Sequence, residues 1–228
     1  MTESSTKTLF GFPVWKSKIE PLSYNKNIIT NVINDNYTKQ PYRNKWKAPS
    51  ESKDEYLIHH SYDDHYNENQ SEPDFSSLID VYCKKIHQFM NETGLCGEFA
   101  FKIVNYTVIN QGQCMPKHHH LNLQDDIAFA ATHYLSFDKN DHSSLRFHND
   151  TYLNMMLSTS RLNALVEHQN SVFGYLNNTY TLDIEEDDLV IFPSCLMHSV
   201  PLISETTSKK NRICVALNIQ MARTQELI

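Results

Sequence analysis

The stretch Phe99-Ala-Phe-Lys-Ile-Val-Asn-Tyr-Thr-Val-Ile109 decides the fold, because the hydrophobic pattern of the 228-residue chain changes there. It is rich in β-branched and aromatic residues, which favour strands. Further candidate strands follow at intervals marked by turn residues: 127–137, 144–147, 170–175, 179–182, 189–192 and 212–221. Helical patterns come before this stretch and strand patterns after it. The order predicts an α+β protein, mainly β, whose strands form a sandwich or a small barrel.

The segment before Gly97 is predicted to hold two helices, a short strand and a long loop. Apolar residues recur at three- and four-residue intervals over 23–35 and 75–90, and Gly94 suits the end of the second helix. A strand broken by Gly and Pro is expected within 9–19. Residues 37–73 are polar and show no sustained period, which predicts a long loop region.

Composition excludes several classes of protein. The formal net charge of -7 argues against a broad electrostatic nucleic-acid footprint, and with only 5 glycines there is no Gly-rich phosphate loop. The 5 cysteines are dispersed and lack a CxxC pair, which favours reduced thiols over a disulfide framework. Neither a signal peptide nor a membrane-spanning apolar run is recognised, so we expect a soluble protein of the cytoplasm.

The run Pro116-Lys117-His118-His119-His120 is the strongest indication of chemistry. Side-chain direction repeats every second residue of a strand, so His118 and His120 would share one face while His119 points away. Imidazole is the commonest protein ligand for a transition metal. A third ligand from a distant strand, His198, would close a metal pocket inside a barrel. The alternative is a polar turn, because an isolated histidine is more often structural than a ligand.

Several motifs in sequence order resemble the 2-oxoglutarate- and Fe(II)-dependent oxygenases, particularly short variants common in phage and marine bacterial genomes. The motifs are His118-His119-His120, Thr132-His-Tyr134-Leu135, Ser143-Ser-Leu145-Arg-Phe147, Asp188-Leu-Val-Ile-Phe-Pro-Ser194, His198 and Arg212. The resemblance covers roughly residues 99–220 and lies more in order and spacing than in any single motif. It implies a double-stranded β-helix, a jelly-roll or cupin-like barrel, with the N-terminal helices packed outside. We expect one domain, 1–228, in which 1–98 carries the helices and loop and 99–221 forms the catalytic core.

The resemblance also implies the chemistry. Fe(II) would be held by His118 and His198, with positions left for 2-oxoglutarate and O₂. The C5 carboxylate of 2-oxoglutarate would meet the planar fork of Arg212, and Tyr134 could add a phenolic hydrogen bond. The enzyme would oxidise an unidentified prime substrate while 2-oxoglutarate is decarboxylated to succinate. A protein side chain, a nucleic acid and a free metabolite all remain open as substrates, and a phage-encoded enzyme would act in the host cytoplasm.

The chain departs from the family pattern at the third ligand. His120 stands where most members have a carboxylate, so the iron has three imidazoles or takes a carboxylate from Asp125 or Asp126. We predict that His120 is the ligand, because strand parity places it correctly. Cys214 stands where Ser is common, which leaves the second partner of the C5 carboxylate open. The alternatives are a metal-binding cupin, which needs no residue like Arg212, and a non-catalytic barrel that binds a partner.

Overall fold

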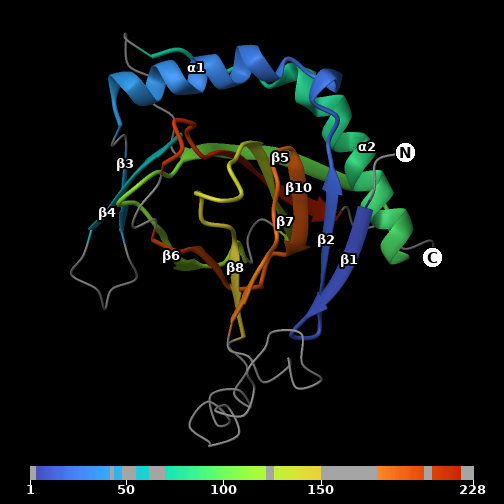
Figure 1. Ribbon diagram of the computed structural model, residues 1–228. Coiled ribbons are helices and arrows are strands. Elements are labelled where there is room, and N and C mark those ends of the chain that lie inside the picture. The colour runs from blue at the N-terminus through green and yellow to red at the C-terminus, as the bar shows by residue number, and fades with distance from the viewer. Residues whose placement is uncertain are drawn as a thin grey trace, which may run out of the picture.

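The computed structural model describes residues 4–41, 44–47, 55–61, 70–121, 126–149, 179–202 and 207–221. Two antiparallel sheets face each other around a central space (Figure 1). The larger sheet has the order β1-β2-β10-β7-β12-β5-β4-β3 and the smaller has the order β6-β11-β8-β9. Such alternation of strands between two sheets is a double-stranded β-helix, as the sequence predicted.

The larger sheet is built from both ends of the chain. Its strands are β1 (Ser4–Leu9), β2 (Phe12–Lys18), β3 (Asn44–Lys47), β4 (Glu55–His60), β5 (Phe99–Val108), β7 (Ile127–Ser136), β10 (Asp188–Pro193) and β12 (Ile213–Met221). β12 lies between β5 and β7 and pairs with both along nearly its whole length. This central position makes β12 the strand that fixes the register of the site.

The smaller sheet consists of short strands. They are β6 (Met115–His118), β8 (Arg146–His148), β9 (Thr179–Thr181) and β11 (His198–Val200). β11 pairs with β6 on one side and with β8 on the other. The strand pairing therefore brings the two histidine segments, 80 positions apart in the chain, to adjacent places in the barrel wall.

Two helices cover the outer face of the larger sheet, α1 (Lys26–Lys39) and α2 (Ser76–Thr93) (Figure 1). Ile33 of α1 and Phe89 of α2 are fully buried there with alternate residues of β12, Val215 and Leu217 among them. α2 ends at Gly94, whose positive φ of 71° suits glycine. The helices are thus packed outside the barrel, as expected.

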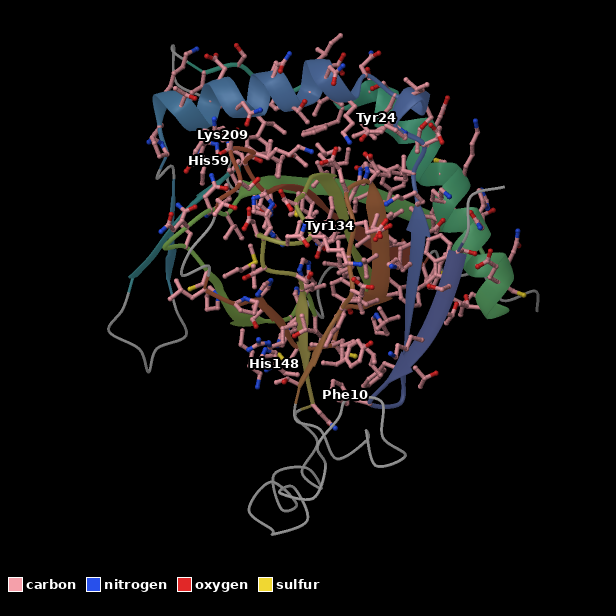
Figure 2. The ribbon with its side chains drawn as sticks, viewed as in Figure 1. Phe10, Tyr24, His59, Tyr134, His148 and Lys209 are labelled. Carbon is pink, nitrogen blue, oxygen red and sulfur yellow. The ribbon has the colours of Figure 1, made fainter. Side chains whose placement is uncertain are left out.

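The interior between the sheets forms a second core. It contains apolar side chains from both sheets, including Tyr134, Phe147 and Phe192. β12 contributes to both cores, because its even-numbered residues face inward and its odd-numbered residues face the helices. Tyr134 lies near the middle of the barrel in Figure 2.

The N-terminal segment differs from the prediction in two places. Residues 9–19 were expected to form one broken strand, whereas β1 and β2 form a hairpin that turns at Phe10 and Gly11, both with positive φ. The predicted loop over 37–73 contains β3 and β4, which extend the larger sheet. Short strands at the edge of a sheet lack the apolar alternation that identifies longer strands. β3 and β4 are strands because they pair with their neighbours, and the periodicity of the sequence did not show this. Of the candidate strands 170–175 and 179–182, the first lies outside the described residues and the second corresponds to β9.

Candidate metal centre

Three histidines converge at one end of the smaller sheet. His118 is the last residue of β6 and His198 the first of β11, and the two are direct cross-strand partners. His120 follows two residues after β6, where its backbone N–H donates to the carbonyl of Ser194 at 2.9 Å. One potential ligand atom from each of the three lies within 4.8 Å of the others. Among the described residues, no other group of three or more His, Cys, Asp or Glu side chains lies so close together.

Each of the three rings is oriented by a hydrogen bond at Nδ1. His118 bonds the carbonyl of Pro116 at 2.8 Å, and His198 bonds the carbonyl of Leu196 at 2.9 Å. His120 bonds Oδ1 of Asn218, on β12, at 2.8 Å. Because all three partners are oxygen acceptors, each neutral imidazole carries its proton on Nδ1 and its lone pair on Nε2. An oxygen partner at the second ring nitrogen is the usual support of a metal-bound histidine.

The electrostatics of the cluster favour the neutral form that binds a metal. Burial, together with the neighbouring imidazoles, lowers the pKa of His118 to about 4, although the bond to the carbonyl of Pro116 opposes the shift. Burial also lowers the pKa of His120. The pKa of His198 lies well below its usual value, first because of burial and then because of the two adjacent imidazoles. All three rings are therefore available as ligands at neutral pH.

A cavity of about 300 Å³ opens onto the histidines. It is lined by residues from both sheets: Val104, Asn105, Thr107, Met115, His118, His119, His120, Leu121, Ile127, Thr132, Leu145, His198, Val200, Arg212, Cys214, Ala216 and Asn218. Its volume is at the lower end of the range of small-molecule sites. The lining contains no carboxylate among the described residues, so the fixed charge of the cavity wall is positive.

Arg212 supplies that positive charge. It is 1% exposed and precedes β12 by one residue. Its Nε donates to the carbonyl of Ser143 at 2.9 Å, and its guanidinium carbon lies 5.4 Å from the centre of the Tyr134 ring. No ion pair joins Arg212 to a carboxylate in the described part of the chain. A buried cation without a counter-ion points to an anionic ligand, because an unpaired buried charge is costly.

Sequence reasoning missed the polar side chains on the cavity floor. Thr107 on β5 lies directly across from Cys214 of β12, and Asn105 and Thr132 lie on either side of Ala216. All three polar residues line the cavity, and the buried Oδ1 of Asn105 has no hydrogen-bond partner among the described residues. The alternation of the strands could have indicated their direction. Only the register between strands brings them together.

The other predicted residues occupy distinct positions. His119 is exposed and also lines the cavity, but it is not part of the histidine cluster, so the expectation that it points away from the pocket holds only for the cluster. Tyr134 is buried beside Arg212, and its hydroxyl has no hydrogen-bond partner of good geometry among the described residues. Burial raises the pKa of Tyr134 above its ordinary value, against the effect of Arg212, so the phenol keeps its proton. Asp126 is not part of the histidine cluster, and Asp125 lies outside the described residues.

A family model described as "Putative 2OG-Fe(II) oxygenase" matches residues 105–218, which run from within β5 into β12 and include the three clustered histidines and Arg212. The match covers half of the chain. The chain belongs to this family of 2OG-Fe(II) oxygenases. It is therefore an enzyme that uses Fe(II), 2-oxoglutarate and O₂. The cupin and the non-catalytic binding module, kept open on sequence grounds, give way to the oxygenase.

Solved structures are similar to this oxygenase at low sequence identity. AviO1 from Streptomyces viridochromogenes Tue57 has a TM-score of 0.51 and 10% identity, with 92% of this chain and 90% of that chain covered. A prolyl-4-hydroxylase from Pseudomonas putida has a TM-score of 0.47 and 13% identity, with 97% and 94% covered. A search of curated protein sequences found no match. The likeness to AviO1 supports the shared fold and carries no statement about substrate.

Proposed function

We propose that this oxygenase binds Fe(II) through His118, His120 and His198. The observation that carries the proposal is the convergence, in one cavity, of three neutral imidazoles and a buried arginine without a carboxylate partner in the described part of the chain. Imidazole suits iron, and the oxygen acceptors at each Nδ1 leave Nε2 for the metal. The donor set of this chain therefore fits Fe(II).

The third ligand in this proposal is His120 and not a carboxylate. Asn218 holds the ring of His120 from the floor of the barrel, and the cavity lining offers no acidic side chain among the described residues. Three neutral ligands leave the metal with one more positive charge than a site with two histidines and a carboxylate. We expect this charge to strengthen the binding of a dianionic co-substrate.

Arg212 is proposed to bind the C5 carboxylate of 2-oxoglutarate. Its Nε is already bonded to Ser143, so its two terminal nitrogens are the donors that a carboxylate can take bidentately. We propose Thr107 as the second partner of that carboxylate. The hydroxyl of Thr107 lines the same cavity, across the strand pair from Cys214, where a serine is common in the family. Tyr134 would complete the group from β7, which also pairs with Cys214.

In the proposed mechanism, the protein binds, orients and excludes water. Bound Fe(II), with 2-oxoglutarate and O₂, supplies the oxidising chemistry that breaks a C–H bond of the prime substrate. His118, His120 and His198 would hold the metal through their Nε2 atoms. The co-substrate is held at its other end by Arg212. Apolar side chains such as Ile127, Leu145 and Val200 keep the cavity wall dry.

The prime substrate is proposed to enter past His119 and Leu121, the exposed residues of the lining. Arg212 is the one lysine or arginine among the described residues that line the cavity. The lining thus offers no cluster of cations for a phosphate backbone, which favours a protein side chain or a metabolite over a nucleic acid. No described helix is long and apolar enough to cross a membrane. We propose a cytoplasmic location, in the host cytoplasm if the enzyme is phage-encoded; the five free cysteines are in keeping with it.

An anaerobic titration tests this function. Fe(II) is added to the metal-free protein, followed by 2-oxoglutarate, and the weak visible charge-transfer band is recorded. We expect saturation at one Fe(II) per chain, a band that depends on 2-oxoglutarate, and succinate once air is admitted. Iron binding without a 2-oxoglutarate-dependent band would contradict the proposed use of Arg212. Failure to bind iron at all would contradict the three-histidine site.

A further inference from the structure

Arg212 lies at the point where the regular pairing of β12 ends. β12 begins at Ile213, and the carbonyl of Arg212 still accepts a hydrogen bond from the backbone of Ile109 at 3.2 Å. The backbone N–H of Arg212, in contrast, donates to a side chain, Oδ1 of Asn110, at 3.1 Å. The direction in which Arg212 leaves the sheet is therefore set by a side-chain amide in the place of a strand carbonyl.

That amide is the first of three that connect Arg212 to the outer helix. Nδ2 of Asn110 donates to Oδ1 of Asn211 at 2.7 Å, and Nδ2 of Asn211 donates to Oδ1 of Asn34, on α1, at 2.7 Å. We call Asn110, Asn211 and Asn34 the asparagine relay. Every bond runs in the same direction, so in Asn110 and Asn211 the oxygen accepts and the nitrogen donates. This pattern fixes the orientation of both amides, and aligned hydrogen bonds strengthen one another.

The backbone of Asn110 is fixed separately, by Gln113 in the same turn. Its backbone N–H donates to Oε1 of Gln113 at 2.7 Å, and its carbonyl accepts from the backbone of Gln113 at 3.0 Å. Gln113 is buried, so this turn cannot shift without breaking bonds that water would not readily replace. The acceptor of the Arg212 N–H is thus held both from its own turn and from α1.

The guanidinium has a separate support. Its Nε donates to Ser143, which belongs to the loop between β7 and β8. The adjacent His142 joins that loop to the chain before β12, through a bond of 3.1 Å between its Nε2 and the carbonyl of Lys210. Ser143 fixes one edge of the fork, and the relay fixes the backbone from which the fork extends. A bidentate contact requires both, because two parallel N–H···O bonds tolerate little displacement.

We propose that the asparagine relay positions Arg212 for the distal carboxylate of 2-oxoglutarate, and so couples α1, outside the barrel, to co-substrate affinity inside it. The inference rests on the proposed role of Arg212. Asn110, Asn211 and Asn34 are positioning residues in this scheme. They act through the arginine and touch neither the metal ligands nor the substrate.

The first experiment cuts the relay at each end. Asn110→Ala and Asn34→Ala are compared with Asn31→Ala, which removes an exposed asparagine one turn earlier on α1. Affinities for Fe(II) and for 2-oxoglutarate are measured without oxygen by equilibrium titration, and thermal unfolding shows that each variant is folded. We expect Asn110→Ala to weaken 2-oxoglutarate binding roughly tenfold and Asn34→Ala roughly threefold, as for the loss of one hydrogen bond. Fe(II) affinity should be unchanged in all three, and Asn31→Ala should match the wild type.

The second experiment asks whether the relay acts through Arg212. Arg212→Lys keeps the charge but loses the fork, and Asn110→Ala is added to it. If the relay positions the fork, Asn110→Ala weakens 2-oxoglutarate binding less than about twofold in the lysine background. An unchanged tenfold effect there, or equal losses of iron and 2-oxoglutarate, would show a merely structural role. If Asn110→Ala keeps full affinity for 2-oxoglutarate, the role of the relay is refuted but the proposed function is not. If Arg212→Ala keeps full affinity for 2-oxoglutarate, the proposed role of Arg212 itself is refuted.

Discussion

His118, His119 and His120 are consecutive residues with different surroundings. His118 and His120 are half-buried and cluster with the buried His198, while His119 is exposed and lies outside the cluster. We expect His118→Ala and His198→Ala to lose bound iron, because each removes one of the three proposed ligands. His119→Ala should retain about one iron per chain. Metal analysis of protein reconstituted with Fe(II) and then desalted gives the comparison, and equal losses in all three variants would refute the assignment.

The identity of the third ligand can be tested by restoring the commoner chemistry. His120→Asp places a carboxylate where most relatives have one, and we expect it to retain iron. Asp126→Ala and Asp125→Ala should leave Fe(II) affinity almost unchanged, because Asp126 lies outside the cluster and His120 already completes it. Affinity is measured by anaerobic competition with a chelator. Loss of iron from either alanine variant, together with full metallation of His120→Ala, would mean that a carboxylate is the third ligand.

A substitution can also test the role of Arg212 in 2-oxoglutarate binding independently of metal binding. Removing one partner of a buried, charge-assisted pair costs on the order of 2–5 kcal/mol, so Arg212→Ala should weaken 2-oxoglutarate binding severely. Iron should remain bound, since Arg212 is not among the clustered ligands. Titration of the Fe(II)-loaded variant with 2-oxoglutarate measures the loss. Turnover with an unchanged KM would require another anchor for the carboxylate.

At the scale of single elements, the sequence predicted long regular segments well. α2 was recognisable because its apolar residues keep a helical spacing and Gly94 follows them. β3 and β4 were missed, because strands of this length are stabilised by their neighbours and not by their own pattern. The histidines were found by their spacing, but the pairing of His118 with His198 is a fact of register. Asn218 and Thr107 were missed, because alternation shows which residues share a face of a strand and not which face lines the cavity.

α2 gives an element-scale prediction. Phe89 is 1% exposed and packs its ring against Trp15 and Phe129, whereas Ile79 on the same helix is 42% exposed. Phe89→Ala should lower the free energy of unfolding by about 3–5 kcal/mol, because it leaves a cavity between helix and sheet. Ile79→Ala should cost less than about 1 kcal/mol. Urea unfolding of the two variants measures the difference, and similar costs would mean that α2 contributes little to the core.

At the scale of the whole molecule, one face of β12 belongs to the structural core and the other face lines the cavity. The odd-numbered residues of β12 pack under the helices, and the even-numbered ones form the cavity floor. The outer helices therefore fix the position of the floor without entering the site. Sequence alone could not assign the two faces, because both are buried and β12 reads as an almost continuous apolar run. In the structure, the cavity side is the one that carries Arg212 and Asn218.

The stability of the metal-free protein in acid depends on a buried histidine between the larger sheet and the helices. His133 of β7 is fully buried; its Nδ1 accepts a hydrogen bond from Tyr82 of α2 at 2.9 Å, and its Nε2 has no partner among the described residues. Burial, and then the charge of Lys26 from α1, lower the pKa of His133 to about 3. The unfolded histidine titrates near 6.5. Between these two values the unfolded chain binds one proton more than the native protein, so native stability falls as the pH decreases.

This one group should make the free energy of unfolding decrease by about 1.4 kcal/mol per pH unit below pH 6.5. We expect His133→Asn, whose amide oxygen can still accept from Tyr82, to show a shallower decrease between pH 6 and pH 4 than the wild type. Below pH 4.5 both proteins should lose further stability as Glu186 protonates; although burial opposes it, the bonds from Lys26, Phe137 and Lys210 hold its pKa at about 2. Urea unfolding at a series of pH values measures the slopes, and His87→Asn, at an exposed site on α2, is the control. The three clustered histidines, His118, His120 and His198, are common to all three proteins, so their contribution cancels in the difference. If the free energy of unfolding falls with pH at the same rate in the wild type and in His133→Asn, then His133 is protonated without loss of the native packing and the prediction is wrong.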